Sequence, residues 1–120
     1  MILKLRSLRN KNVLIVEDEY VIALDLEHTV RKHGANVVGP ASSVDEAMNL
    51  LAHTRIDCAV LDINLQGERV YTVADSLQRA GIPYVFATGY DAPSIPERYE
   101  KVPCICKPFD PEVVTSVLRT

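Results

Sequence analysis

Short apolar runs that end on polar residues are the feature that most constrains the fold of this sequence. The runs occupy residues 13–16, 37–38, 58–61, 84–87 and 102–106. Most of them are continuous rather than alternating, which is typical of strands buried on both faces of a parallel sheet. Segments with helical spacing lie between them, so the sequence predicts an α/β fold.

Capping residues and periodic apolar positions predict where the helices lie. Glycines are expected to end two of them, Gly34 after the first and Gly81 after the third. Ser43 and Glu46 form a capping box for the second, and Asp110 precedes a first-turn proline in the last. Two prolines in segment 91–101 leave room for only a short or irregular fourth helix. Strand and helix therefore alternate five times, which predicts one doubly wound domain with right-handed crossovers.

Composition excludes several classes of partner. The 120 residues carry a net charge of −3 and a pI near 5.5, so direct binding to nucleic acid is not expected. Residues 1–11 form a basic arm, and residues 12–120 are expected to form the domain. No apolar stretch approaches the length needed to span a bilayer, so we expect a cytoplasmic protein without membrane contact.

The three cysteines all fall inside apolar runs. We expect Cys58, Cys104 and Cys106 to be small buried hydrophobic residues in a reducing compartment. The histidines lie in other segments without the spacing of metal ligands, so a Cys/His metal site is not expected.

Polar residues follow four of the predicted strands. The first run ends on Glu17 and Asp18, the third on Asp62, the fourth on Thr88 and the fifth on Lys107. Ligands of open α/β sheets bind beyond the carboxyl ends of the strands, so these side chains should converge. Each residue alone could simply mark a strand end, but their convergence predicts a functional site.

Three carboxylates in one pocket repel each other by on the order of 4 kcal/mol per close pair. Either one of them takes up a proton or a cation lies among them, and Mg²⁺ suits an all-oxygen site. Thr88 and Lys107 add a hydroxyl and a positive charge, which phosphoryl transfer needs. Asp62 is then a candidate nucleophile, because carboxylates form aspartyl phosphates.

Motifs at these positions resemble those of the two-component response-regulator receiver domain. They are VLIVEDE (13–19), VLDINL (60–65), FATGY (86–90) and CKPF (106–109), and the similarity covers residues 12–119. The resemblance implies a flavodoxin-like fold with five parallel strands in the order 2-1-3-4-5. The FATG stretch is similar to an alphaproteobacterial-type subgroup.

The resemblance also implies roles for individual residues. Asp62 would accept a phosphoryl group from a histidine kinase or phosphotransfer protein, and Thr88 and Lys107 would bind phosphoryl oxygens. Asp18 and Asp62 would ligate Mg²⁺, with the backbone carbonyl of Asn64 and with Glu17 acting through water. Lys107-Pro108 is where the family usually has a cis bond.

A phosphoacceptor of this kind would be a switch rather than an enzyme, with self-phosphorylation from small donors and slow autodephosphorylation. It would control a protein partner or an output domain missing from the sequence. The resemblance does not decide whether the chain forms a homodimer.

One position of the site departs from the family pattern. Cys104 stands where most members have an aromatic residue that moves with the threonine, so the usual coupling is in doubt. Tyr90 is a candidate substitute, although it could equally just cover the edge of the site. Asn64 and Tyr90 occupy the two positions that tune phosphate loss in the family.

Two other functions remain alternatives. The chain could be a receiver-like module that binds proteins without phosphate, although such modules normally lack the aspartate or lysine. It could also be an aspartyl-nucleophile phosphatase, but those enzymes usually place the nucleophile after the first strand. A dinucleotide site would need a glycine-rich turn where Glu17-Asp18-Glu19 stands.

Overall fold

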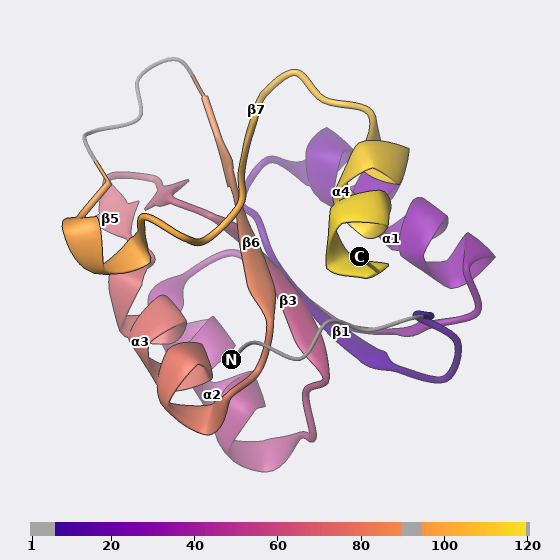
Figure 1. Ribbon diagram of the computed structural model, residues 1–120, viewed down its shortest axis with the longest axis horizontal. Coiled ribbons are helices and arrows are strands. Elements are labelled where there is room, and N and C mark those ends of the chain that lie inside the picture. The colour runs from indigo at the N-terminus through magenta and orange to yellow at the C-terminus, as the bar shows by residue number, and fades with distance from the viewer. Residues whose placement is uncertain (1–6, 90–94, 120) are drawn as a thin grey trace.

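A single parallel sheet with helices on both faces makes up the computed structural model, which describes residues 7–89 and 95–119 (Figure 1). The five strands of the sheet are arranged β2-β1-β3-β6-β7, which is the predicted order 2-1-3-4-5 along the chain. Their bounds are β1 Asn12–Val16, β2 Asn36–Ala41, β3 Cys58–Asp62, β6 Tyr84–Thr88 and β7 Cys104–Cys106. The predicted flavodoxin-like α/β fold is confirmed.

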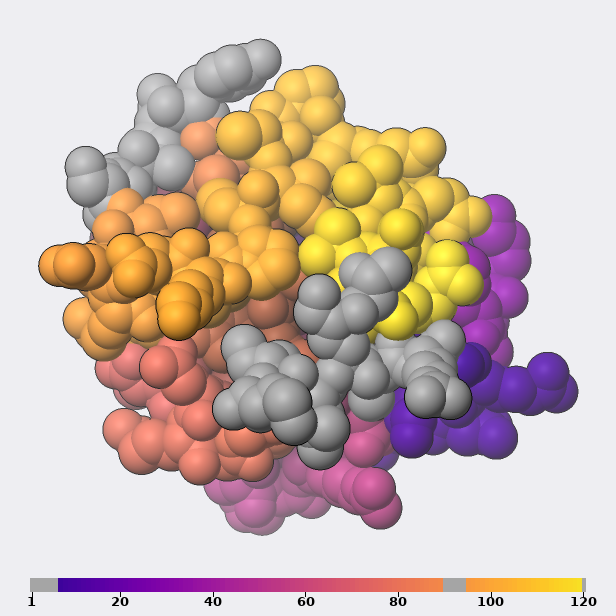
Figure 2. Space-filling model, in the orientation of Figure 1, coloured from indigo at the N-terminus to yellow at the C-terminus, as the bar shows by residue number. Residues whose placement is uncertain are grey.

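Helices α2 and α3 cover one face of the sheet, and α1 and α4 cover the other (Figure 1). In the space-filling view α4 lies at the surface, beside the chain that leads into it from β7 (Figure 2). The helices are α1 Tyr20–Lys32, α2 Val44–His53, α3 Tyr71–Ala80 and α4 Pro111–Arg119. Between β6 and β7 the described residues form one 3-10 turn, η1 Glu97–Tyr99, in line with the predicted short fourth helix.

The predicted caps are present at the helix ends. Ser43 Oγ accepts from Glu46 N at 3.1 Å, although the Glu46 carboxylate reaches Ser42 N instead of completing the box at Ser43. Asp110 Oδ1 accepts from Glu112 N at 2.9 Å, and Gly81 ends α3 with a left-handed φ of 72°. Local sequence therefore determines these boundaries.

A hairpin that the sequence analysis did not predict follows β3 directly. Its strands are β4 Asn64–Leu65 and β5 Glu68–Arg69, paired antiparallel. Gln66 and Gly67 both have positive φ, 53° and 91°, as a two-residue type I′ turn requires. The hairpin leads from the end of β3 to the start of α3.

Apolar side chains fill the space on both sides of the sheet. Every residue of β3 and of β6 is buried, as expected for central strands covered on both faces. Leu8, from the described end of the basic arm, belongs to this core, because it is 1% exposed and lies in one buried cluster with Val114 and Leu118. The boundary at residue 12 stays a prediction.

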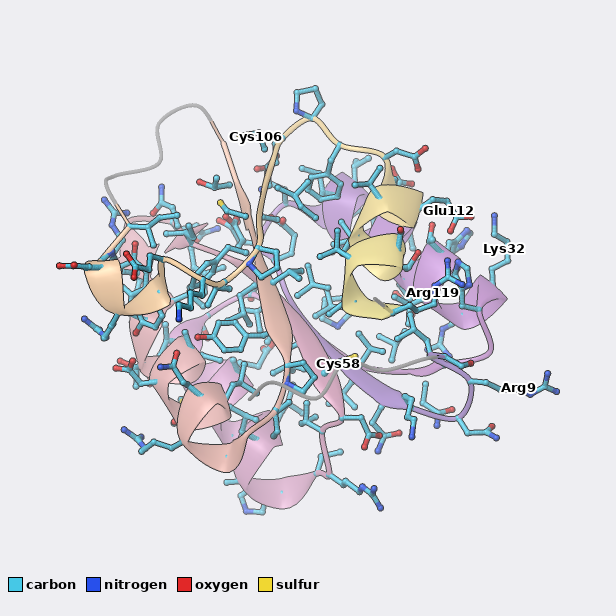
Figure 3. The ribbon with its side chains drawn as sticks, in the orientation of Figure 1. Arg9, Lys32, Cys58, Cys106, Glu112 and Arg119 are labelled. Carbon is cyan, nitrogen blue, oxygen red and sulfur yellow. The ribbon has the colours of Figure 1, made fainter. Side chains whose placement is uncertain are left out.

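The expectation that all three cysteines are buried is wrong for two of them. Cys58 in β3 is buried, but Cys104 and Cys106 in β7 are exposed. Figure 3 shows Cys58 within the layers of the fold and Cys106 towards the end of β7. The reason is that β7 is an edge strand, and the described residues just before it supply only a 3-10 turn to cover it.

Gly39 is expected to tolerate no side chain, because it has a φ of +96° and a tightly packed backbone. A Cβ there would lie 2.9 Å from Ile15 O and 2.7 Å from Ala41 N. Gly39→Ala should therefore reduce the free energy of unfolding by about 3 kcal/mol or more. Gly81→Ala is the control, because it shares the positive φ but has open space, and it should cost about 1 kcal/mol. Urea unfolding measures both, and equal losses would show that φ alone limits Gly39.

Candidate functional site

The carboxyl ends of β1, β3, β6 and β7 bring the predicted polar residues to one edge of the sheet. Asp62 pairs in register with Ala87, and Thr88 pairs with Cys106, so Asp62, Thr88 and Lys107 follow neighbouring strand ends. Carboxylate oxygens of Glu17, Asp18 and Asp62 lie within 4.8 Å of one another. The structure therefore brings together the residues that the sequence placed at separate strand ends.

Lys107 links the acidic residues of this edge. Its Nζ donates to Asp62 Oδ2 at 3.2 Å and to Glu17 Oε2 at 3.0 Å. Its backbone N donates to Thr88 O at 2.7 Å, and the Lys107-Pro108 bond is cis, as in the pattern that the sequence resembles. With the side chain 11% exposed, the ammonium is held against the carboxylates rather than in solvent.

Glu19 is a further partner of Lys107 that the sequence analysis missed. Its Oε1 accepts from Lys107 Nζ at 2.9 Å, although the Glu19 side chain is 60% exposed. Glu19 precedes the first residue of α1 and ends no strand, so the strand-end argument did not select it. Its signal in the sequence was its place in the acidic run Glu17-Asp18-Glu19.

Burial destabilises the charged forms of the two innermost carboxylates. Burial, followed by the neighbouring Asp62 charge, raises the pKa of Glu17 to about 7 despite its contact with Lys107. Burial also raises the pKa of Asp62, against the opposing effects of a hydrogen bond with Glu17 and of the Lys107 charge. Burial alone would lower the pKa of Lys107, but its hydrogen bonds to Glu19 and Glu17 raise it. One ammonium therefore does not fully offset the cost of burying these two carboxylates.

The donor set at this edge fits a divalent cation such as Mg²⁺. All three clustered side chains offer oxygen, and the buried Glu17 Oε1 lies 3.0 Å from Lys107 Nζ but accepts no hydrogen bond from the described residues. The backbone carbonyl of Asn64 is also available. In an antiparallel ladder, hydrogen-bonded and non-hydrogen-bonded residue pairs alternate. Val70 N donates to Ile63 O, so the next pair, Asn64 and Arg69, is a non-hydrogen-bonded one. The Asn64 carbonyl therefore has no partner in β5.

Thr88 lies at the end of β6, and its hydroxyl makes only a weak hydrogen bond. Its side chain is 6% exposed, and Oγ1 donates a long hydrogen bond of 3.4 Å to Gly89 O. A hydroxyl held this loosely can reorient towards an oxygen that arrives beside Asp62.

A cluster of aromatic rings packs near the end of β6 that carries Thr88, and the sequence did not predict it. Phe86, two residues before Thr88 on the same face of β6, meets the Tyr99 ring edge-on at 5.6 Å. Tyr99 stacks on Tyr71 at 5.2 Å, and its single hydroxyl proton points to two acceptors, Tyr71 O and the Asp75 carboxylate. The register partner of Phe86 in β7 is Cys104, the position where the resemblance predicts an aromatic residue in most members. The other candidate, Tyr90, lies outside the described residues.

A family model described as the response regulator receiver domain matches residues 13–119. The chain belongs to this family. Receiver domains of two-component systems are signalling switches rather than enzymes, and they generally bind Mg²⁺ at an acidic pocket. In the described part of this receiver, no helix is long and apolar enough to cross a membrane.

Several known proteins are similar to this receiver domain. The phyllosphere-induced regulator PhyR of Methylorubrum extorquens is 36% identical over 88% of this chain and 41% of that protein. The sensory transduction protein LytT of Bacillus cereus is 31% identical over 89% of this chain and 45% of that protein. This chain thus spans less than half of these two relatives.

Solved structures agree with the sequence comparison. SdrG from Sphingomonas melonis Fr1 superposes with a TM-score of 0.80 at 35% identity, over 92% of this receiver and 97% of that chain. The receiver domain of Erythrobacter litoralis PhyR superposes with a TM-score of 0.75 at 27% identity, over 90% and 86%. Similarity to PhyR and SdrG is consistent with the alphaproteobacterial-type subgroup.

Asp62→Asn is expected to stabilise this receiver when no divalent cation is present. A neutral carboxamide removes a buried charge whose pKa is raised in the folded state, and that charge costs stability above the raised pKa. The gain should be on the order of 1 kcal/mol, read as a higher melting temperature at pH 8 in a metal chelator. Asp25→Asn, at an exposed position of α1, should change little. A lower melting temperature for Asp62→Asn would show that the Lys107 ion pair outweighs the cost of burial.

Proposed function

We propose that this receiver is a phosphoacceptor switch in which Asp62 takes a phosphoryl group in a Mg²⁺-dependent step. The observation that carries the proposal is the contact of Lys107 Nζ with the Asp62 carboxylate, at 3.2 Å, beside two further acids. A fixed cation beside a buried carboxylate suits a group that will carry phosphoryl oxygens. A relative 37% identical to this chain, SdrG, has been solved in a conformation described as BeF3-activated.

The proposed chemistry uses the residues at the strand ends. An Asp62 carboxylate oxygen attacks phosphorus, the bond from phosphorus to the donor breaks, and the donor leaves with the electron pair. The Lys107 ammonium then gives up one of its hydrogen bonds to the carboxylates and donates to a phosphoryl oxygen. The Thr88 hydroxyl donates to a second phosphoryl oxygen. Glu17, Asp18, Asp62 and the Asn64 carbonyl would hold Mg²⁺, which when bound supplies positive charge to the phosphoryl oxygens.

The donor in this proposal is a histidine kinase or a phosphotransfer protein, and the readout is a protein partner or an output domain. The shared domain of PhyR and LytT, which are more than twice as long as the matched segment, is compatible with either form of output. One relative, PhyR of Bartonella quintana, is described as an anti-anti-sigma factor, and this chain covers 47% of it. Residues 12–120 would form the switch and residues 1–11 the arm that precedes it.

Intact mass spectrometry after incubation with acetyl phosphate and Mg²⁺ tests the acceptor. We expect one added phosphoryl group on the wild-type protein, and none on Asp62→Asn or in the presence of a chelator. An adduct that persists on Asp62→Asn would place the acceptor elsewhere. No adduct on the wild type, also with a histidine phosphodonor, would favour a phosphate-independent binding module. Continuous turnover of phosphomonoesters would favour a phosphatase.

Glu19→Gln is expected to speed phosphorylation. The substitution weakens one contact of Lys107 Nζ, because a neutral amide oxygen replaces a carboxylate, and it removes a negative charge that repels an anionic donor. Because the Glu19 side chain is exposed and screened, the rate constant with acetyl phosphate should rise only roughly 2–5-fold, and less at high salt. Glu100→Gln, an exposed change after η1, is the control and should leave the rate unchanged. A slower rate in Glu19→Gln would mean that Glu19 helps to hold Lys107 in place for catalysis.

A further inference from the structure

The β4–β5 hairpin positions Asn64 immediately after the acceptor. Asn64 lies two residues beyond Asp62, and its backbone N donates to Asp62 Oδ1 at 3.3 Å. The Asn64 side chain is exposed, so it lies where water has access to the neighbourhood of the acceptor carboxylate. Any group carried by Asp62 would therefore have the Asn64 residue as a near neighbour.

The Asn64 carboxamide oxygen is engaged by the hairpin itself. Gly67 N and Arg69 Nη1 each donate to Asn64 Oδ1 at 2.9 Å. Both partners are donors without acceptor capacity, so the atom they meet is the carbonyl oxygen. Two hydrogen bonds use both of its lone pairs, and Oδ1 has no capacity left to accept from a water molecule.

Two features of the hairpin position Arg69 for this contact: its pairing across the strands and the hydrogen bond of its neighbour to α2. Asn64 and Arg69 are cross-strand partners in the antiparallel register. The preceding residue, Glu68, accepts from Val44 N with its Oε1 at 3.2 Å, which ties β5 to the first residue of α2. The guanidinium is thus presented to Asn64 by the backbone geometry of β5.

Loss of a phosphoryl group from an aspartyl phosphate requires a directed water molecule. The water oxygen attacks phosphorus, the bond between phosphorus and the Asp62 oxygen breaks with its electron pair left on the carboxylate, and the proton lost by the water passes to an oxygen of the departing phosphate. A nearby oxygen that accepts a hydrogen bond from this water would orient it for attack. The Asn64 carboxamide could supply such an acceptor if its oxygen were free.

We propose that Arg69 is a positioning residue that lengthens the lifetime of the phosphorylated Asp62 by holding Asn64 Oδ1 away from the attacking water. This inference rests on the proposed phosphoacceptor function of Asp62. It assigns the rate of phosphate loss to a side chain seven positions beyond the acceptor, which acts only through Asn64. Arg69 itself contacts neither the acceptor nor its neighbouring acids in the described structure.

The decay of the phosphorylated protein tests the proposal. Wild type and Arg69→Ala are phosphorylated with acetyl phosphate and Mg²⁺, the donor is removed, and the remaining adduct is followed by intact mass. We expect Arg69→Ala to shorten the half-life roughly 3–10-fold, as expected for the loss of one exposed hydrogen bond. Arg69→Lys should restore part of the lifetime. Arg79→Ala, an exposed change on α3, should match the wild type.

Two further measurements separate this role from a structural one. In an Asn64→Ala background, Arg69→Ala should have no further effect on the half-life, because the group it restrains is absent. In the unphosphorylated protein without Mg²⁺, Arg69→Ala should shift the side-chain amide NMR signals of Asn64 while the melting temperature stays close to that of wild type.

An unchanged half-life in Arg69→Ala, or the same acceleration in the Asn64→Ala background, would overturn the proposal. So would unshifted Asn64 amide signals. Failure of the proposed function would look different. The wild-type protein would then take up no phosphoryl group on Asp62, and no decay could be followed.

Discussion

The burial of two carboxylates at one sheet edge is the constraint on which the rest of the structure depends. Glu17 and Asp62 are almost fully buried, and burial raises the pKa of both. The ammonium of Lys107 offsets part of this cost, and it can do so only because β7 lies beside β6 with its end at the same edge. The strand order therefore serves the site: a sheet that placed β7 elsewhere would leave two buried acids without their cation.

The described part of the crossover between β6 and β7, residues 95–103, is stabilised by side-chain contacts of its 3-10 turn. Tyr99 is 1% exposed and stacks on Tyr71, and each aromatic pair of this kind contributes about 0.5–1.5 kcal/mol beyond burial. Arg98 lies 4.5 Å from the centre of the Tyr99 ring and pairs with Asp75 on α3. These contacts anchor η1 to α3, while two of the three residues of β7 stay exposed.

The fold and the strand-end residues could be predicted because they follow from local pattern and chain order. Continuous apolar runs indicate buried parallel strands. The residue after each run then lies at the edge of the sheet formed by the carboxyl ends of the strands, whichever rotamer its side chain adopts. Glu19 and Arg69 could not be found this way, since their contacts depend on rotamers and on loop geometry. The exposure of Cys104 and Cys106 was missed for a related reason: an apolar run predicts a strand but does not show what will cover it.

The uneven exposure of the cysteines has a practical consequence for following this molecule in solution. Burial raises the pKa of the Cys58 thiol to about 12, so it stays protonated and out of reach of alkylating reagents. Cys104 and Cys106 lie on the surface of β7, and Cys106 is bonded directly to the residue whose ammonium contacts Asp62. A thiol-reactive fluorophore would therefore attach to the edge strand alone, without any engineered cysteine, and report from beside the acceptor.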